Sequence, residues 1–172
     1  MKEIEVKILE IDVEEVEEKL KEMGAEKVFD GELVNIYFDF PDKRLEKEGK
    51  VLRLRKKDEK VILTYKKLIS QDEAKIMDEN ELEIQDLDLM EKIFKEIGLL
   101  PLYEFKKNRT TYKLDRIHFE IDKYPNIPVF LEIEAPDLEA IDEMVSKLGF
   151  SKEEVSSYSI KEVLEHYGKI SP

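Results

Sequence analysis

A strict alternation of charged and aliphatic residues at the N-terminus most constrains what this chain can fold into. In the stretch 1–9, single aliphatic residues separate Glu3, Glu5 and Lys7. Because successive side chains of a strand point to opposite faces, the three charges share one face and the aliphatic residues share the other. The stretch is therefore predicted to be a strand with one apolar face and one charged face.

Similar charged rows recur along the chain. The basic positions are Lys7, Arg53, Arg55, Lys66, Lys107 and Arg109, and the acidic positions are Glu3, Glu5, Glu81, Glu83, Glu120, Asp122, Glu132 and Glu134. An open antiparallel sheet with a solvated charged face is one interpretation. However, exposed ion pairs contribute only about 0–1 kcal/mol each, so stability alone is a poor reason for such uniform rows. If the sheet closes into a barrel, the charged face becomes a lumen and helices cover the outside.

Apolar residues at helical spacing predict helices that end at glycines. Strands are expected at 1–9, 27–40, 51–57, 61–68, 102–114, 116–123 and 129–135, with a further one opening at Glu81 and Glu83. Helices are expected at 13–23, 87–97, 138–148 and 159–167. On the second helix, the apolar residues expected on one side are Leu89, Ile93, Phe94 and Ile97. The polar stretch 70–80 has no sustained periodicity and is expected to be a flexible loop.

Composition excludes several kinds of site. The 172 residues suffice for a single domain spanning 1–172. A net charge of −13 argues against nucleic acid or an acidic membrane as a partner, because phosphates attract basic patches. There are no cysteines and only His118 and His166, which leaves oxygen-ligated cations as the plausible metals. With no membrane span and no signal peptide, we expect a cytoplasmic protein. The sequence does not indicate its oligomeric state.

The mixture of bases and acids in one lumen indicates which ligand would balance it. Six bases match a polyanion, with arginines making forked contacts to phosphate oxygens and lysines acting as point charges. Clusters of carboxylates match one or two Mg²⁺ or Mn²⁺ ions bound through oxygen. The two together are typical of a site for a metal-complexed di- or triphosphate.

The same residues carry a family resemblance. The N-terminal Glu3-Ile4-Glu5-Val6-Lys7 resembles the ExExK strand of the CYTH superfamily, which includes class IV adenylyl cyclases, thiamine triphosphatases and inorganic triphosphatases. Further motifs follow in the family's order: Tyr37-Phe38-Asp39, Leu52-Arg53-Leu54-Arg55, Leu63-Thr64-Tyr65-Lys66, Glu81-Leu82-Glu83, Lys107-Asn108-Arg109, Leu131-Glu132-Ile133-Glu134 and Ser157-Tyr158. The ordered set spans nearly the whole chain. It implies an α+β fold, a closed eight-stranded antiparallel barrel with a charged lumen and helices packed outside.

The resemblance also implies roles for individual residues. The metal ligands would be Glu3, Glu5, Asp122, Glu132 and Glu134, and the catalytic strand would carry Glu3, Glu5 and Lys7. The phosphate contacts would be Lys7, Arg53, Arg55, Lys66, Lys107, Arg109 and Lys161, and the other lumen residues Glu81, Glu83 and Glu120. Lys161 could equally be a solvated helix lysine, and Glu120 a structural partner of a lumen base. The turn 124–128 lacks a glycine common in the family, and Lys67 stands where several cyclases have glycine, so no particular nucleoside pocket is transferred.

These expectations leave three functions open. Hydrolysis of a small-molecule triphosphate (inorganic triphosphate, thiamine triphosphate or a nucleoside triphosphate) with Mg²⁺ or Mn²⁺ is preferred, because it requires only metal ligands and phosphate contacts. A class IV adenylyl cyclase, which converts ATP to cyclic AMP and pyrophosphate, is the alternative. It is favoured by Lys107-Asn108-Arg109 and Ser157-Tyr158, but it needs an adenine pocket that the sequence does not identify. A non-catalytic module that binds polyphosphate or a nucleotide is the second alternative.

Overall fold

A computed structural model describes residues 2–170. The strands are β1 (Lys2–Ile8), β2 (Glu26–Asp39), β3 (Lys50–Lys57), β4 (Lys60–Gln71), β5 (Lys75–Ile84), β6 (Leu100–Leu114), β7 (Ile117–Lys123), β8 (Phe130–Ala135) and β9 (Val155–Ser156). The helices are α1 (Val13–Glu22), α2 (Arg44–Lys47), α3 (Leu87–Glu96), α4 (Leu138–Lys147) and α5 (Ile160–His166), with a 3-10 turn at Lys152–Glu154. In residues 2–170, no helix combines the length and the hydropathy that a membrane span needs.

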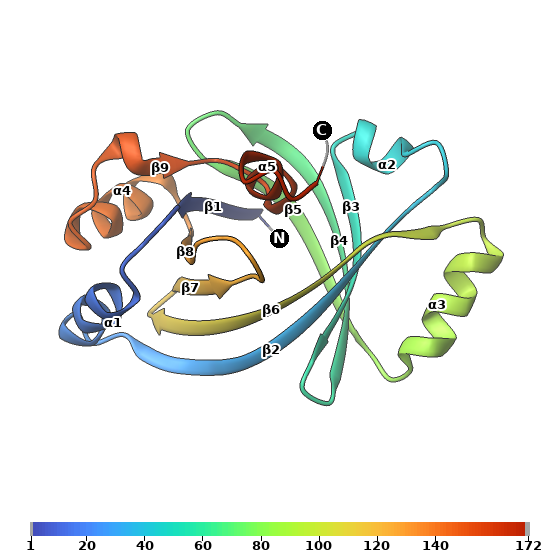
Figure 1. Cartoon of the computed structure of the whole chain (residues 1–172), viewed down its shortest axis with the longest axis horizontal. Helices are drawn as coiled ribbons and strands as arrows, with labels where there is room; N and C mark the ends of the chain where they lie inside the picture. Colours follow the sequence, from blue (N-terminus) through green and yellow to red (C-terminus); the bar gives the residue numbers. More distant parts are fainter. Residues whose placement is uncertain (1, 171–172) are drawn as a thin grey trace.

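Strands β1 to β8 form a closed antiparallel barrel, as the sequence predicts. Neighbouring strands follow the order β5-β4-β3-β2-β6-β7-β8-β1, and β1 also pairs with β5, which closes the ring. The strand β1 therefore joins the two ends of the sheet. Its residues Lys2 to Glu5 pair with β5, and its residues Ile4 to Ile8 pair with β8. The two-residue strand β9 adds to β1 outside this ring. Figure 1 shows the helices on the periphery of the strands.

The aliphatic face of β1 forms the centre of the main core. Ile4, Val6 and Ile8 are at most 2% exposed and pack in one cluster with residues of α1 and α4, such as Leu20 and Val145. Asp12 is the N-cap of helix α1, and its carboxylate accepts a hydrogen bond from the backbone N–H of Glu15 at 3.1 Å. Because the opposite face of β1 is also buried, its charged side chains must lie inside the molecule.

Two expectations about local structure are wrong. The stretch 70–80 is not a loop, since β4 extends to Gln71 and β5 begins at Lys75. This segment lacks a regular apolar face, but its backbone pairs with both β4 and β1. On α3, only Phe94 of the four residues expected on one side is buried; Leu89, Ile93 and Ile97 are exposed. The helix packs instead through Phe94, Leu87 and Met90 on Phe38 and Leu54 of the barrel wall.

Candidate functional site

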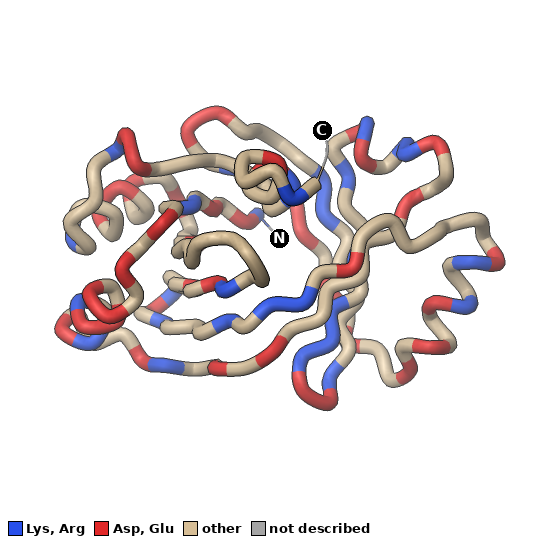
Figure 2. The backbone as a smooth tube through the Cα atoms, in the orientation of Figure 1, with Lys and Arg blue, Asp and Glu red and all other residues tan. Residues whose placement is uncertain are grey.

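The barrel encloses a cavity of about 760 Å³ lined by the charged rows. The predicted residues that line it are Glu3, Glu5, Lys7, Arg53, Arg55, Lys66, Glu81, Lys107, Arg109, Glu120, Asp122, Glu132, Glu134 and Lys161. Figure 2 shows acidic and basic positions recurring along the strands as well as on the helices. Among the predicted lumen residues, only Glu83 lies outside this lining. Its carboxylate is exposed and contacts Lys60 at 2.9 Å.

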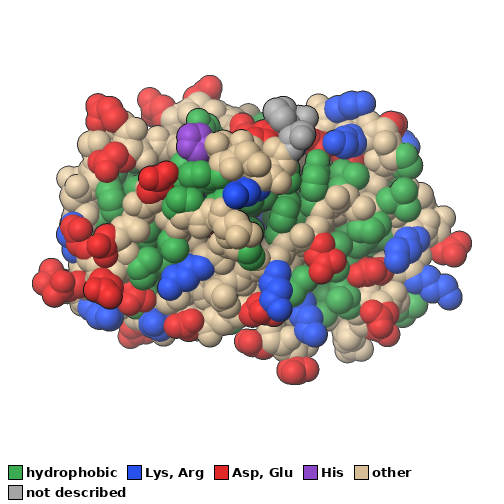
Figure 3. All heavy atoms as spheres, viewed as in Figure 1, with side chains coloured by type: hydrophobic (Ala, Val, Ile, Leu, Met, Phe, Trp, Pro, Cys, Tyr) green, Lys and Arg blue, Asp and Glu red, His purple; other side chains and the backbone are tan. Residues whose placement is uncertain are grey.

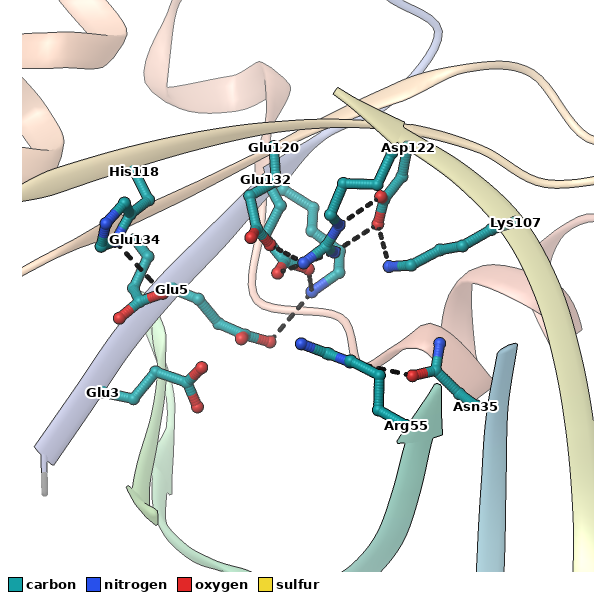
Figure 4. A network of polar contacts seen from close by, with 12 residues as sticks. Glu3, Glu5, Asn35, Arg55, Lys107, His118, Glu120, Asp122, Glu132 and Glu134 are labelled. Atoms are coloured by element: carbon teal, nitrogen blue, oxygen red, sulfur yellow. Dashed lines mark hydrogen bonds and ion pairs between the residues drawn. The ribbon is translucent and has the colours of Figure 1, made fainter. Parts of the chain in front are cut away.

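Asp122 on β7 is the centre of the most buried charge network. Its carboxylate accepts Nζ of Lys107 at 2.6 Å and both Nε and Nη2 of Arg109 at 2.6 Å, and the residue is 1% exposed. Burial raises the pKa of Asp122, but Arg109 and Lys107 outweigh it and the pKa is lowered. Arg109 also contacts Glu120 and, at 3.4 Å, Glu132 (Figure 4). Asp122 thus fixes two of the predicted phosphate contacts.

The charged face of β1 is bound to its neighbours by ion pairs. Lys7 Nζ lies 2.9 Å from Glu5 and 2.8 Å from Glu132, and Lys75 contacts Glu5 at 2.9 Å. Burial raises the pKa of Glu5, but Lys7 and Lys75 overcome this effect and lower it to about 2. The cross-strand register explains the geometry, since Lys7 lies directly opposite Glu132 on β8. Glu3 is held by Lys66 of β4, the strand on the other side of β5, whose Nζ lies at 2.7 Å.

Strand β3 carries two basic lumen residues, Arg53, which contacts Glu81 at 3.6 Å, and Arg55. Arg55 forms no ion pair with any described residue; its Nε donates to the amide oxygen of Asn35 at 3.0 Å. Burial and the adjacent cations Arg53 and Arg109 lower the pKa of Arg55. The neighbouring Arg53 is 6% exposed, and within residues 2–170 its buried Nε has no hydrogen-bond partner. Burial and Arg109 likewise lower the pKa of Lys107 to about 8. Among the described residues, Arg55 and the Nε group of Arg53 therefore remain available to an anion.

Another part of the lumen has an excess of carboxylates. Burial and then the carboxylates of Glu3, Glu120 and Glu132 raise the pKa of Glu134 to about 8. Among the described residues, Glu134 lies 3.9 Å from Nδ1 of His118, but burial and Lys113 lower the pKa of His118, so this imidazole carries little charge at neutral pH. Figure 4 shows Glu134, Glu3 and Glu5 directed into the same region of the lumen. Burial, with Glu3 and Glu81, also raises the pKa of Glu79 to about 7. Crowded acids of this kind favour a cation.

The donor chemistry of this acidic region fits a hard divalent ion. Carboxylate oxygens are the ligands that Mg²⁺ and Mn²⁺ prefer, and the region offers several in one enclosed space. Across residues 2–170, no three carboxylate or imidazole groups already converge as a set of metal ligands. Most of the predicted ligands are instead occupied by lysine or arginine, as Glu3 is by Lys66 and Glu5 by Lys7. Metal binding here requires exchange of these ion pairs.

Aromatic rings line the part of the lumen next to the basic residues. Phe105 of β6 stacks on Tyr103 at 5.8 Å between centroids and meets Tyr37 of β2 edge-on at 5.7 Å. All three rings are half-buried and line the cavity. Tyr37 lies opposite Arg53 in the β2–β3 register, so this aromatic wall adjoins the two arginines of β3. Tyr124 and Phe130 continue the wall beneath α5, where Val163 packs on them.

Lys161 of α5 also lines the cavity. Its Nζ lies 2.5 Å from Glu46 of α2 and 3.4 Å from Glu165 of its own helix. Its side chain is 32% exposed, so it is neither fully solvated nor enclosed with the lumen bases. A contact between Lys161 and a ligand would have to compete with Glu46.

Several lining residues were missed by the sequence analysis. Lys75 and Glu79 belong to the β5 segment that was expected to be a loop. Asn35 and Thr64 are uncharged members of lumen-facing rows: Asn35 accepts from Arg55, and Thr64 accepts Nη2 of Arg53 at 3.1 Å. Neither pair gives a clear signal in the sequence, because polar outward residues flank Glu79 and because Asn35 and Thr64 carry no charge.

The sequence profile of the CYTH domain matches residues 1–163. This chain belongs to the CYTH family. The family comprises triphosphate tunnel proteins, which bind triphosphate substrates and typically use divalent metal ions. The charged lumen of this CYTH protein lies within the matched residues.

Relatives match the CYTH protein over nearly its whole length. A protein of Methanocaldococcus jannaschii named "Putative adenylate cyclase" is 29% identical over 172 residues, which covers 95% of this chain and 98% of the relative. A solved protein of Pyrococcus horikoshii is 28% identical with a TM-score of 0.80, covering 93% of this chain and 98% of the other. A structure from Hippeastrum, described as a putative adenylyl cyclase with a dominant triphosphatase activity, has a TM-score of 0.66 at 17% identity, covering 99% and 97%. That last likeness shows the fold alone.

Proposed function

We propose that this CYTH protein is a metal-dependent hydrolase of triphosphate substrates, namely inorganic triphosphate, thiamine triphosphate or a nucleoside triphosphate. The observation that carries the proposal is the imbalance within the lumen. Arg55 lacks an acidic partner among the described residues, and the buried Nε of Arg53 lacks a hydrogen bond there. Buried cations are costly unless an anion pairs with them, and guanidinium groups suit phosphate oxygens. A bound polyphosphate would satisfy both groups.

The proposed roles follow the two charged regions. Arg53, Arg55, Lys66, Lys107 and Arg109 bind phosphate oxygens, with Lys7 at the junction with the acidic region; Lys161 is an additional contact near α5. Glu3, Glu5, Asp122, Glu132 and Glu134 supply oxygens for Mg²⁺ or Mn²⁺, among which Glu134 is the least engaged by bases. A bound divalent ion would supply charge neutralisation and orientation of the nucleophile. Glu81 and Glu120 position lumen bases, through Arg53 at 3.6 Å and through Arg109.

The proposed reaction needs no covalent bond between the protein and the substrate. The bases neutralise negative charge on the equatorial oxygens, and the enclosed walls hold the phosphates in line for attack by water on the terminal phosphorus. In this proposal the carboxylates Glu3 and Glu5 on β1 orient that water, and its proton passes to a carboxylate of the lumen or to solvent. The phosphorus–oxygen bond to the leaving diphosphate breaks, so the products are orthophosphate and the shortened chain.

Product analysis tests this proposal. The protein is incubated with tripolyphosphate, thiamine triphosphate, ATP and GTP under Mg²⁺ or Mn²⁺, and orthophosphate, pyrophosphate and cyclic nucleotide are resolved. We expect orthophosphate as the main product. Arg55→Met should lower kcat/KM by roughly 10- to 100-fold, the value of a charged hydrogen bond of about 1.5–3 kcal/mol. The exposed neighbour Lys56, in the substitution Lys56→Met, is the matched control. Ligand binding without turnover would indicate a binding module instead.

An adenylyl cyclase is the second candidate, and the aromatic wall favours it. Tyr37, Tyr103 and Phe105 lie beside the basic residues, where they could hold a nucleobase by ring stacking. The name of the Methanocaldococcus jannaschii relative points the same way. The Hippeastrum protein, however, is described as a triphosphatase despite its cyclase name, so such a name is not decisive. Cyclic AMP and pyrophosphate as the main products from ATP would establish the cyclase.

A further inference from the structure

Helix α3 presents a row of exposed apolar residues that the tunnel does not use. Leu89, Ile93 and Ile97 are 54%, 45% and 60% exposed. At a spacing of four residues they lie along one face of the helix and span about 12 Å. The helix is already anchored through its other apolar face, by Phe94. In Figure 3, hydrophobic side chains lie among charged ones at the right-hand end, where Figure 1 places α3.

The charges that flank this row complement one another across a two-fold axis. Lys92 and Glu96 lie on one side of the row, are both exposed, and form no ion pair within the described part of the chain. If two α3 helices pack antiparallel around an axis at Ile93, Leu89 of one copy meets Ile97 of the other. The same operation places Lys92 of each copy beside Glu96 of the other. Two equivalent ion pairs then border one continuous apolar contact.

We propose that two copies of this chain associate through α3 in this antiparallel arrangement. The row is evenly spaced and apolar at each position, so in an antiparallel pair centred on Ile93 every apolar residue meets an apolar residue, as a self-complementary interface needs. A membrane is a poor alternative, because helices that lie on acidic lipid have a basic polar face. Here α3 carries Asp88, Glu91 and Glu96 against Lys92 and Lys95, on a chain of net charge −13.

This interface leaves the tunnel free. Beneath α3 lies Leu54, which points out of the barrel from β3, whereas its neighbours Arg53 and Arg55 point into the lumen. Dimerisation through α3 therefore covers an outer wall, and the dimer and monomer should bind tunnel ligands alike. The proposal does not depend on which reaction occurs in the lumen.

Sedimentation velocity of the full chain over a range of concentrations tests the proposal. We expect a species of about twice 20.4 kDa for the wild type. Ile93→Glu should weaken association at least about 10-fold, because the substitution acts on both copies at the centre of the contact. Ile69→Glu is the matched control, since Ile69 is 59% exposed on β4, away from α3, and it should leave the dimer intact. Circular dichroism verifies folding of each variant.

Charge exchange provides a second, independent test. Lys92→Glu and Glu96→Lys should each weaken the dimer, because each places two like charges side by side at both symmetry-related contacts between the copies. The double variant should restore the dimer. Recovery in the double variant would support the antiparallel arrangement over non-specific adhesion. A wild type that sediments as a monomer at every concentration, a dimer that survives Ile93→Glu, or a double variant that fails to recover would each overturn the proposal.

Discussion

Replacement of Asp122 with asparagine should destabilise the barrel strongly. The carboxylate accepts three hydrogen bonds of 2.6 Å from Lys107 and Arg109 and is 1% exposed. Removal of one partner from a buried ion pair costs about 3–5 kcal/mol. Arg109 keeps Glu120 and Glu132, and Lys107 can lose its proton because its pKa is lowered to about 8. We therefore expect a loss near the lower end, about 3 kcal/mol in the free energy of unfolding.

Urea denaturation followed by circular dichroism measures this loss in metal-free protein. At roughly 2–4 °C per kcal/mol for a chain of this size, the melting midpoint should also fall by about 6–12 °C. Glu83→Gln is the control, since its exposed pair with Lys60 should contribute only about 0–1 kcal/mol. If Asp122→Asn is as stable as Glu83→Gln, Asp122 does not hold the basic residues of the lumen in the way described here.

Three further predictions concern the lumen and its outer wall. Glu134→Gln should abolish metal-dependent turnover. The melting midpoint should stay level or rise, because the change removes a carboxyl group that burial and its neighbours Glu3, Glu120 and Glu132 disfavour as an anion. A collapse of the fold would show that the carboxylate is structural. Phe105→Leu should raise KM for ATP several-fold and leave KM for tripolyphosphate unchanged if the aromatic wall holds a base; equal effects in steady-state kinetics would contradict this. Phe94→Ala should cost about 3–5 kcal/mol in urea denaturation, since this ring anchors α3; a change below 1 kcal/mol would argue against that anchor.

The strands of the barrel were predictable because charged residues of the lumen face alternate with aliphatic residues of the outer face. Glu3, Glu5 and Lys7 alternate with core residues such as Val6, and the later rows repeat the pattern. The family resemblance added the closure of the ring, which alternation alone left open. The lumen charges could be identified for the same reason, whereas their pairing could not. The contact of Lys66 on β4 with Glu3 on β1 depends on the pairing of both strands with β5, which closes the ring.

The errors arose where a segment has either no apolar face or two. On β5, the outward residues Asp78 and Asn80 are polar, so the lumen-facing Lys75 and Glu79 did not stand out as a row. On α3, apolar residues occupy two arcs, and hydrophobicity alone does not say which arc packs on the barrel. The structure selects the arc of Phe94 and leaves the other exposed.

Thermal melting with and without tripolyphosphate and Mg²⁺ tests the central claim most directly. The claim is that the basic residues and crowded carboxylates of the lumen form a site for a metal-complexed polyphosphate, in which Arg55 gains the anionic partner that it lacks among the described residues. A ligand that binds only the native state increases the free energy of unfolding by mass action, by about 2.7 kcal/mol at 100 times its dissociation constant. The melting midpoint rises as a result. We predict a clear increase for the wild type and a smaller one for Arg55→Met. No increase at saturating tripolyphosphate and Mg²⁺ would contradict the account.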